Sequence, residues 1–211
     1  MVDGSGIDVD QLRPQFTPLP PGTEVMLTDC PDKSTSTGEL AAFAMTKKPY
    51  RKRLGELLWL ARVTRPDISA AVARLSTVAN NPGQIHWDLT SYLIQYVYHT
   101  RHLGVVYDRK KSSYPYGFED VAFSPHYGHD GDNYRSFEGC LMKNAGGPIA
   151  WSARFQKNLA LSSIESEYYG LTSAAKMAIH LTELCNELGI FSNEPFLIYE
   201  DNKAAIKMSQ N

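Results

Sequence analysis

The spacing of apolar residues changes in the middle of this 211-residue chain, and that change constrains its fold more than any other feature. Between residues 50 and 103, apolar residues recur with the period of an amphipathic helix. Between residues 114 and 155 the period falls to two, as in strands that bury one face. We therefore expect a helical segment followed by a sheet-containing segment, and neither an all-α nor an all-β fold.

Three helices with short turns are predicted within residues 50–103. Pro66 and Asp67 favour the start of the second helix, because proline fits the first helical position and an acid suits the positive end of the helix dipole. The run Asn80–Gly83 ends that helix, and the third one ends near Gly104.

The second half reads as an α/β domain. The NAGG turn at residues 144–147 is typical of a β-hairpin, and a long helix is predicted from Ser163 to about Leu188, with Gly189 as its C-cap. The start of one more helix follows the last strand. The predicted strands cover residues 104–108, 114–124, 135–144, 148–155 and 195–201.

The first 48 residues differ from both halves. Residues 11–24 carry four prolines, and residues 32–39 are small and polar. Such stretches cannot bury enough apolar surface to offset the entropy lost on ordering. We predict a proline-rich extended arm over residues 1–48.

Composition narrows the class of protein. A net charge of −2 indicates that any nucleic-acid contact depends on local patches. The three cysteines are widely spaced and odd in number, so we expect no disulfide framework and a reducing, intracellular compartment. No apolar run approaches the roughly 18 residues of a membrane helix, and the polar residues 1–10 do not form a signal peptide.

Two aspartates occupy positions where α/β sheets carry functional groups. Asp120 lies within the strand predicted over residues 114–124, and Asp201 lies at the carboxyl end of the strand predicted over residues 195–201. Ligands of open α/β sheets gather at the carboxyl ends of strands. The long helix beginning at Ser163 is the expected source of a third carboxylate.

That helix offers Glu165 and Glu167. Ser162 and Glu165 have the spacing of a capping box, which gives Glu165 a structural role. Glu167 lies one turn before Leu171 and borders the expected sheet-facing stripe, so we select Glu167. The stripe is expected to comprise Ile164, Tyr168, Leu171, Ala175, Ala178, Leu181, Cys185 and Leu188.

Three converging carboxylates repel one another unless cations neutralise them. Mg²⁺ prefers hard oxygen ligands, and two such ions about 4 Å apart can clamp a phosphodiester during hydrolysis. The alternative is three unrelated surface acids, since the chain has 23 acidic residues. The spacing of the acids leaves both interpretations open.

Several blocks of the chain together resemble one family. They are YRKRLGELLWLARVTRPDISAAVARLS, GGPIAWSARFQKNLALSSIESEYYGLTSAAKMAIHL and IYEDNKAAI. In this order, over roughly residues 49–211, they resemble the tail of a copia-type retrotransposon polyprotein; TRPDI and ALSSIESEY are the most specific blocks. In that family a helical segment after the reverse transcriptase leads into a ribonuclease H domain. The resemblance thus implies a helical connection segment over residues 49–111 and a ribonuclease H-like domain over residues 112–211.

The implied fold is a mixed sheet, with a three-stranded antiparallel meander plus a parallel strand and helix. The family pattern G-Y-S-D-A-D-W-A aligns with residues 117–124, which gives Asp120 the catalytic role and leaves Ala122 in place of a second aspartate. The patterns S-T-E-A-E-Y and D-N-x-x-A give the other two roles to Glu167 and Asp201. The resemblance implies that the three residues hold Mg²⁺ (or Mn²⁺).

Two departures from the family accompany this match. Ribonuclease H domains carry a fourth acidic residue, or a histidine, beyond a further helix and strand, and the sequence ends at Asn211 before these elements. The loop over residues 124–133 also differs from the family's GDxxDRRSTSG run. The resemblance therefore implies a domain that is incomplete at its C-terminus.

Two other groups of residues have alternative interpretations. His126 and His129, close to Asp130 and Asp132, could bind Zn²⁺ or Mn²⁺ or form a solvated turn. A basic cluster could contact the phosphates of a hybrid duplex, direct nuclear import or form a solvated helix start. This cluster comprises Lys47, Lys48, Arg51, Lys52 and Arg53.

The predicted function is metal-dependent endonucleolytic cleavage of the RNA strand in RNA–DNA hybrids during retrotransposon replication. The expected partners are the hybrid and an upstream reverse transcriptase domain, with no membrane partner. The expected location is the cytoplasm, in a virus-like particle, or the nucleus. The alternative is a catalytically inert, co-opted retroelement fragment that serves as a protein or nucleic-acid interaction module.

Overall fold

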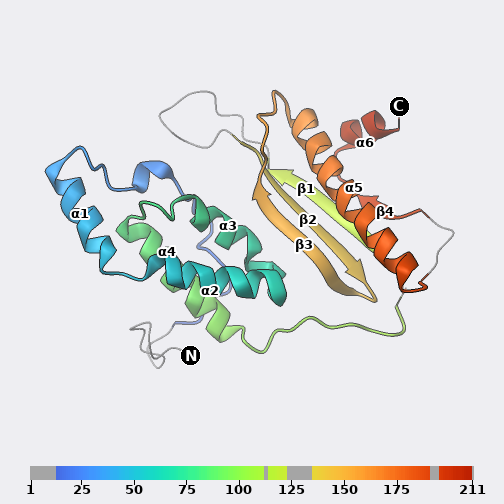
Figure 1. Cartoon of the computed structure of the whole chain (residues 1–211), viewed down its shortest axis with the longest axis horizontal. Helices are drawn as coiled ribbons and strands as arrows, with labels where there is room; N and C mark the ends of the chain where they lie inside the picture. Colours follow the sequence, from blue (N-terminus) through green and yellow to red (C-terminus); the bar gives the residue numbers. More distant parts are fainter. Residues whose placement is uncertain (1–12, 112–113, 123–134, 191–194, 211) are drawn as a thin grey trace. The chain divides into compact units, whose positions relative to one another are not determined.

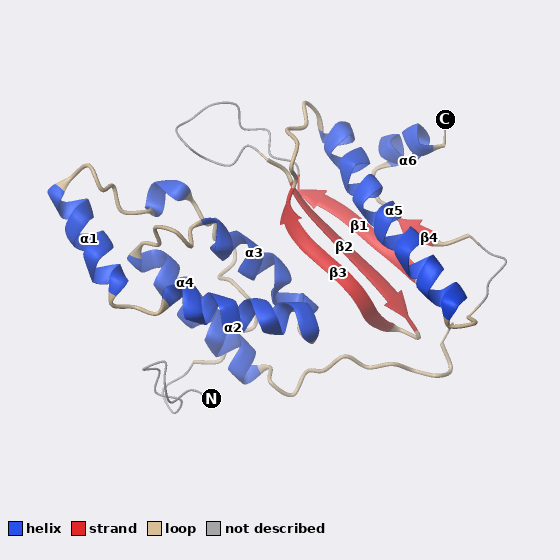
Figure 2. Cartoon of the chain, in the orientation of Figure 1, coloured by secondary structure: helices blue, strands red, loops and turns tan. Residues whose placement is uncertain are grey.

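The chain forms two compact units, Met1–Gly104 and Val105–Asn211, which are drawn in Figures 1 and 2. The structure is a computed structural model, and it describes residues 13–111, 114–122, 135–190 and 195–210. Unit 1 is helical and unit 2 combines helices with one sheet, as the change of apolar period predicts. Each unit has its own cluster of buried apolar side chains.

The core of unit 1 lies between the three predicted helices. Their apolar stripes meet in one cluster that includes Leu54, Ile68, Leu75 and Leu93, of which Ile68, Leu75 and Leu93 are fully buried. The prediction of three helices in residues 50–103 is confirmed. The elements are α2 (Tyr50–Val63), a 3-10 turn η3 (Pro66–Ile68), α3 (Ser69–Thr77) and α4 (Gln84–His99).

The predicted extended arm is wrong for part of residues 1–48. A short 3-10 turn, η2 (Leu27–Asp29), and an α-helix, α1 (Ser36–Thr46), form there. Helix α1 begins after Thr35, whose hydroxyl accepts a 3.1 Å hydrogen bond from the backbone N–H of Gly38. Leu19, Val25 and Cys30 pack against the helical core. This packing supplies the apolar burial that the composition of the segment did not suggest.

The TRPDI block joins α2 to α4 through a hydrogen-bond network. The guanidinium of Arg65, 6% exposed, donates to both carboxylate oxygens of Asp67, at 2.9 and 2.7 Å. It also donates to the carbonyl and the hydroxyl of Thr100, and the hydroxyl of Tyr96 donates to Asp67 at 2.8 Å. The network satisfies a nearly buried guanidinium and ties the turn at Pro66 to the end of α4.

Unit 2 has a four-stranded mixed sheet in the order β3-β2-β1-β4. The first three strands form an antiparallel meander, and β4 pairs in parallel with β1. The prediction of an α/β fold with this meander is confirmed. The strands are β1 (Tyr116–Ala122), β2 (Phe137–Asn144), β3 (Gly147–Phe155) and β4 (Leu197–Tyr199).

The predicted strand at residues 104–108 does not form. The segment follows the β2–β3 hairpin through isolated contacts, since the N–H of Asp108 donates to the carbonyl of Ala145 at 2.8 Å and the hydroxyl of Tyr107 donates to the carbonyl of Pro148. The hairpin turn itself is as predicted: Ala145 and Gly146 have φ of 49° and 80°, the positive values of a two-residue turn that follows the twist of the strands.

Helix α5 (Ser163–Glu187) covers one face of the sheet (Figure 2), and the short α6 (Lys203–Ser209) packs against α5. The core between α5 and the sheet contains Met142, Ala174 and Leu181. Ser162 caps α5 by accepting a hydrogen bond from the N–H of Glu165, as predicted. This layer determines which side chains of β1 face the helix and which face away from it.

Candidate metal centre

The register between β1 and β4 brings two pairs of acids level with each other. Tyr116 lies opposite Leu197 and Phe118 opposite Tyr199 in this parallel pair. Continuing the register by one residue and then two places Glu119 level with Glu200, and Asp120 level with Asp201. Because successive side chains of a strand point in opposite directions, Glu119 and Asp120 leave β1 differently: Glu119 is buried and Asp120 is exposed.

Asp120, Glu167 and Asp201 form the outer acid group. One carboxylate oxygen from each residue lies within 4.8 Å of the other two. Asp120 and Asp201 are exposed, whereas Glu167 is 7% exposed. The three acids selected from the sequence therefore converge, and two of them are open to a ligand arriving from solvent.

Glu167 reaches this position because of how α5 rests on the sheet. The buried face of α5 carries Glu167, Gly170, Ala174 and Ala178, with Leu181 further along. Glu167 thus lies within the sheet-facing stripe and not at its border. The predicted apolar stripe is wrong at its first two and last positions, because Ile164, Tyr168 and Leu188 are exposed. The small residues allow the helix backbone to lie close to β1.

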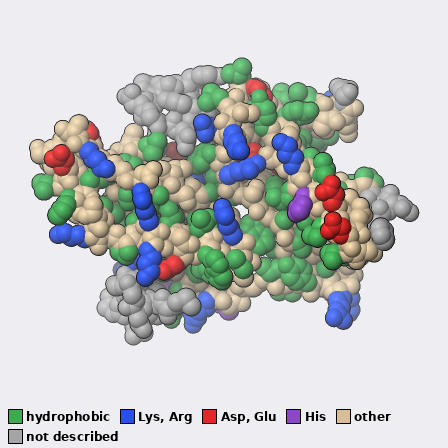
Figure 3. Space-filling view, in the orientation of Figure 1, with side chains coloured by type: hydrophobic (Ala, Val, Ile, Leu, Met, Phe, Trp, Pro, Cys, Tyr) green, Lys and Arg blue, Asp and Glu red, His purple; other side chains and the backbone are tan. Residues whose placement is uncertain are grey.

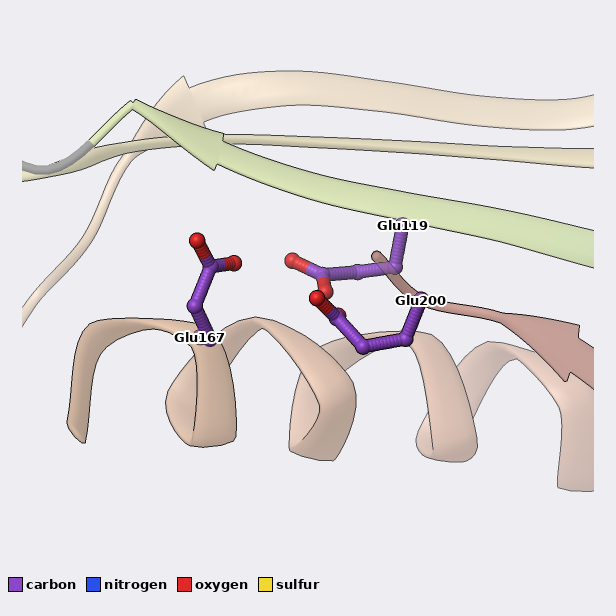
Figure 4. Close-up of side chains that lie close together, drawn as sticks. All are labelled: Glu119, Glu167 and Glu200. Carbon is purple, nitrogen blue, oxygen red and sulfur yellow. The ribbon is translucent and has the colours of Figure 1, made fainter. Parts of the chain in front are cut away.

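Glu119, Glu167 and Glu200 form the inner acid group, which the sequence prediction missed. Their carboxylate oxygens also lie within 4.8 Å of one another. Figure 4 shows Glu119 projecting from β1, with its carboxyl group next to that of Glu200, and Glu167 pointing from α5 into the same layer. The signal for this group was a pair of acid doublets: Glu119-Asp120 lies in β1, and Glu200-Asp201 directly follows β4, which pairs with β1 in parallel.

The electrostatics of both groups follow from burial and like charge. Burial raises the pKa of Glu119 to about 10, and the nearby carboxyl group of Glu200 and the charges of Glu167 and Glu138 add to the rise. Burial likewise raises the pKa of Glu167 to about 7, and the charges of Glu200, Asp120 and Asp201 add to the rise. Without a cation, these surroundings therefore favour the neutral form of Glu119 and of Glu167 over the charged form.

Two nearby acids have ordinary structural partners. Glu138 forms an ion pair with Arg154, with 2.6 Å between Oε1 of Glu138 and Nε of Arg154. Glu165 accepts hydrogen bonds from the N–H of Leu161 and the hydroxyl of Tyr169. Glu165 thus stabilises the start of α5, in keeping with the choice of Glu167 as the inward acid. Among the residues that the structure describes, no ion pair includes Glu119, Glu167 or Glu200.

The donor set fits a hard divalent cation. Every ligand atom in the two groups is a carboxylate oxygen, the donor type that Mg²⁺ and Mn²⁺ prefer. A cation would neutralise the charge that raises the pKa of Glu167. The outer group would present such a cation to solvent, because Asp120 and Asp201 are exposed.

Known proteins resemble the chain over most of its length. It is 31% identical to the retrovirus-related Pol polyprotein from transposon TNT 1-94 of Nicotiana tabacum over 199 residues, which is 94% of this chain and 14% of that protein. It is also 31% identical to the Pol polyprotein from transposon RE2 of Arabidopsis thaliana, over 82% of the chain and 12% of that protein. The chain belongs to the retrovirus-related Pol polyproteins of transposons. It spans about one seventh of the tobacco Pol polyprotein.

A shorter protein also matches the chain. The secreted RxLR effector protein 161 of Plasmopara viticola is 34% identical over 138 residues, which is 65% of this chain and 94% of that protein. No model of a protein family matches the chain, and no solved structure matches it. The membership in the Pol family therefore rests on the sequences of individual relatives.

The basic cluster divides in the structure. Arg53 is 4% exposed, and its guanidinium lies 3.6 Å from the centre of the Trp87 ring. The prediction that Arg53 belongs to a phosphate-binding surface is therefore wrong. Arg51 donates to the carbonyl of Ala79 and the amide oxygen of Asn80. Lys47 and Lys52 are exposed, and Lys48 is half-buried beside Gln84. Basic side chains lie at several separate places on the face drawn in Figure 3.

The remaining predicted site, His126 and His129 with Asp130 and Asp132, lies outside the described residues. The three cysteines, all within the described part of the chain, are free. None of the helices among the described residues is both long enough and apolar enough to cross a membrane.

Proposed function

We propose that unit 2 is a ribonuclease H-like domain of a copia-type retrotransposon Pol polyprotein, which cleaves the RNA strand of RNA–DNA hybrids. The convergence of Asp120, Glu167 and Asp201 within 4.8 Å is the observation that carries this proposal. The mixed sheet and the covering helix α5 support it, as does the similarity to transposon Pol polyproteins.

Each acid has a separate task in this proposal. Asp120 and Asp201, exposed beyond the paired part of β1 and β4, would hold the ends of the cation site that meet the substrate. Glu167 would hold the buried side, where the backbone of Val121 favours the charged form of its carboxyl group and lowers its pKa. Mg²⁺ or Mn²⁺, when bound, supplies the positive charge that stabilises displacement at a phosphodiester.

Recognition of the hybrid would depend on its backbone and its 2′-hydroxyls, without base specificity. We retain Lys47, Lys48, Arg51 and Lys52 as proposed phosphate contacts, because charge neutralisation drives such binding. An upstream reverse transcriptase domain remains a proposed partner, and the cytoplasm (in a virus-like particle) or the nucleus a proposed location.

Replacement of Asp120 tests the proposal. With the full chain, Mg²⁺ and a labelled RNA–DNA hybrid, we expect Asp120→Asn to slow RNA cleavage by about 100-fold or more, because the ligand contributes several kcal/mol of charge stabilisation. Glu183→Gln is the matched control: it makes the same charge change at an exposed position of α5. Equal cleavage rates for the Asp120 variant and the native chain would contradict the proposal.

A second candidate is a co-opted interaction module without catalysis. It is favoured by the match over 94% of the length of a protein that is named a secreted effector, and by Ala122 in place of the family's second aspartate. Calorimetric titration of the native chain with Mg²⁺ and then Mn²⁺ separates the two. Absence of binding at millimolar metal, together with absence of cleavage, supports the module.

A further inference from the structure

We propose that Glu119, Glu167 and Glu200 hold a hard divalent cation, Mg²⁺ or Mn²⁺, at a site of their own between α5 and the sheet. The site goes beyond the proposed function, because it uses neither Asp120 nor Asp201. It shares Glu167 with the outer acid group. Its cation would be enclosed between α5 and the sheet, whereas a cation held by the outer acid group would face solvent.

The first argument is the lack of partners for Glu119. Glu119 is 5% exposed. Both of its carboxylate oxygens are buried and have no hydrogen-bond donor among the described residues. Its polar neighbour is Glu200, another carboxylate, with which it can share a hydrogen bond only through an added proton. Buried carboxylates normally have paired charges or bind metals.

The second argument is that the three side chains point toward one another. They come from three separate elements, β1, α5 and the residue after β4, and their oxygens lie within 4.8 Å of one another. Figure 4 shows the carboxyl groups directed into one layer. Glu167 and Glu200 each also have one buried oxygen without a partner among the described residues. Each of the three acids thus has at least one such oxygen.

The third argument is the space made by Gly170. A Cβ at this position of α5 would overlap Oε1 of Glu119 and lie 2.7 Å from a methyl carbon of Val121. The helix therefore lacks a side chain at the point where the carboxylate lies. Because Gly170 has no side chain, the carboxyl group of Glu119 fits between α5 and the sheet and does not extend to solvent.

The chemistry of the donors selects the cation. All ligands are carboxylate oxygens, with no sulfur or imidazole, which favours Mg²⁺ and Mn²⁺ over Zn²⁺. Three carboxylates leave coordination positions for water, which Mg²⁺ keeps readily. Glu200 is half-buried, so water can reach that side of the group.

Counting bound Mn²⁺ in the full chain tests the site. The probe is MnCl₂ alone, and free Mn²⁺ is measured by electron paramagnetic resonance. The double variant Asp120→Asn/Asp201→Asn removes the outer pair, and we expect it to retain one bound Mn²⁺ and to gain thermal stability on Mn²⁺ addition. Adding Glu119→Gln/Glu200→Gln should abolish both effects, whereas adding Glu183→Gln should leave them unchanged.

The opposite results overturn the inference. They are loss of all Mn²⁺ binding in the Asp120/Asp201 variant, or binding that survives the change of Glu119 and Glu200. A proton-sharing pair without metal predicts that Glu119→Gln stabilises the native chain equally with and without Mn²⁺. If the fourfold variant does not fold, as judged by circular dichroism, Glu200→Gln alone must weaken Mn²⁺ binding to the Asp120/Asp201 variant at least tenfold.

The same variants separate this inference from the proposed function. If Asp120→Asn abolishes hybrid cleavage while Glu119→Gln/Glu200→Gln leaves the number of bound Mn²⁺ ions unchanged, the inner site is excluded and the nuclease stands. If the native chain does not cleave but the Asp120/Asp201 variant binds one Mn²⁺ through Glu119, the inner site stands and the nuclease is excluded.

Discussion

A difference of one position along β1 decides the environment of an acid in this chain. Glu119 is buried under α5 and Asp120 is exposed, although they are adjacent. Glu167 could be selected in advance because helical spacing distinguishes it from Glu165. Glu119 and Glu200 were not selected, because their meeting depends on the register of β1 and β4, and the three paired residues of β4 are too short a run to predict that register.

At the residue scale, we predict that Asp67→Asn destabilises unit 1. The change removes the charged acceptor of Arg65, which is 6% exposed and hydrogen-bonded to both carboxylate oxygens. The expected loss is about 1–3 kcal/mol at pH 7, the cost of leaving a buried charged group poorly satisfied. Urea unfolding measures it, and Asp88→Asn, which removes the charge from a surface acceptor of a Gln84 hydrogen bond, should cost about 0.5 kcal/mol or less.

The same residue predicts a pH dependence. Burial raises the pKa of Asp67, but hydrogen bonds from Arg65 and Tyr96 outweigh it, so the pKa lies below its ordinary value of 3.8. The stabilisation by the carboxylate is therefore fully present above about pH 3.8 and is lost as the pH falls through the lowered pKa. The stability gap between the native chain and Asp67→Asn should narrow below this pH; a constant gap from pH 7 to pH 3 would contradict the assignment.

At the element scale, contact with β1 governs the placement of α5. The length and start of α5 were predictable, because a serine cap and a long apolar pattern mark them. Its rotation about its axis was not, because small residues such as Gly170 and Ala174 carry little hydropathy signal and yet permit close approach. Helix α1 was missed for a related reason: its cap at Thr35 lies in a polar stretch that resembles a linker.

We predict opposite effects for two glycine-to-alanine changes in helices. Gly170→Ala places a methyl group against Glu119 and Val121, and we expect it to destabilise unit 2 by about 1–3 kcal/mol through overpacking. Gly55→Ala, in α2, meets no atom within 4 Å and should stabilise unit 1 by about 0.5–1 kcal/mol through helix propensity. Thermal unfolding measures both, and stabilisation by Gly170→Ala would contradict the packing at that position.

At the scale of the whole molecule, the chain is two units with separate cores. The change from a period near 3.6 to a period of two predicted a helical stretch followed by one with a sheet, because the two patterns belong to structures with different packing surfaces. The domain boundary between residues 111 and 112 stays a prediction, and the two units meet at Gly104. The parallel pairing of β4 with β1 was predicted only from the resemblance to copia-type polyproteins. No local pattern in residues 195–201 indicates which strand they join.

We predict that each unit loses protection independently. Asp67→Asn should increase amide hydrogen exchange in α2, α3 and α4 while leaving β1, β2 and β3 unchanged, since the apolar cluster of each unit is its own. Gly170→Ala should do the reverse. Exchange followed by mass spectrometry measures this, and an increase spread over both units by either variant would show a single cooperative unit.

Glu167 contributes to both acid groups, and this has an evolutionary consequence. Loss of Glu119 or Glu200 affects the inner acid group and leaves Asp120 and Asp201 of the outer acid group in place. A change at the helix position alters both groups at once. Among descendants of this chain, Glu167 should therefore drift more slowly than Glu119 or Glu200, whether or not the nuclease chemistry is under selection.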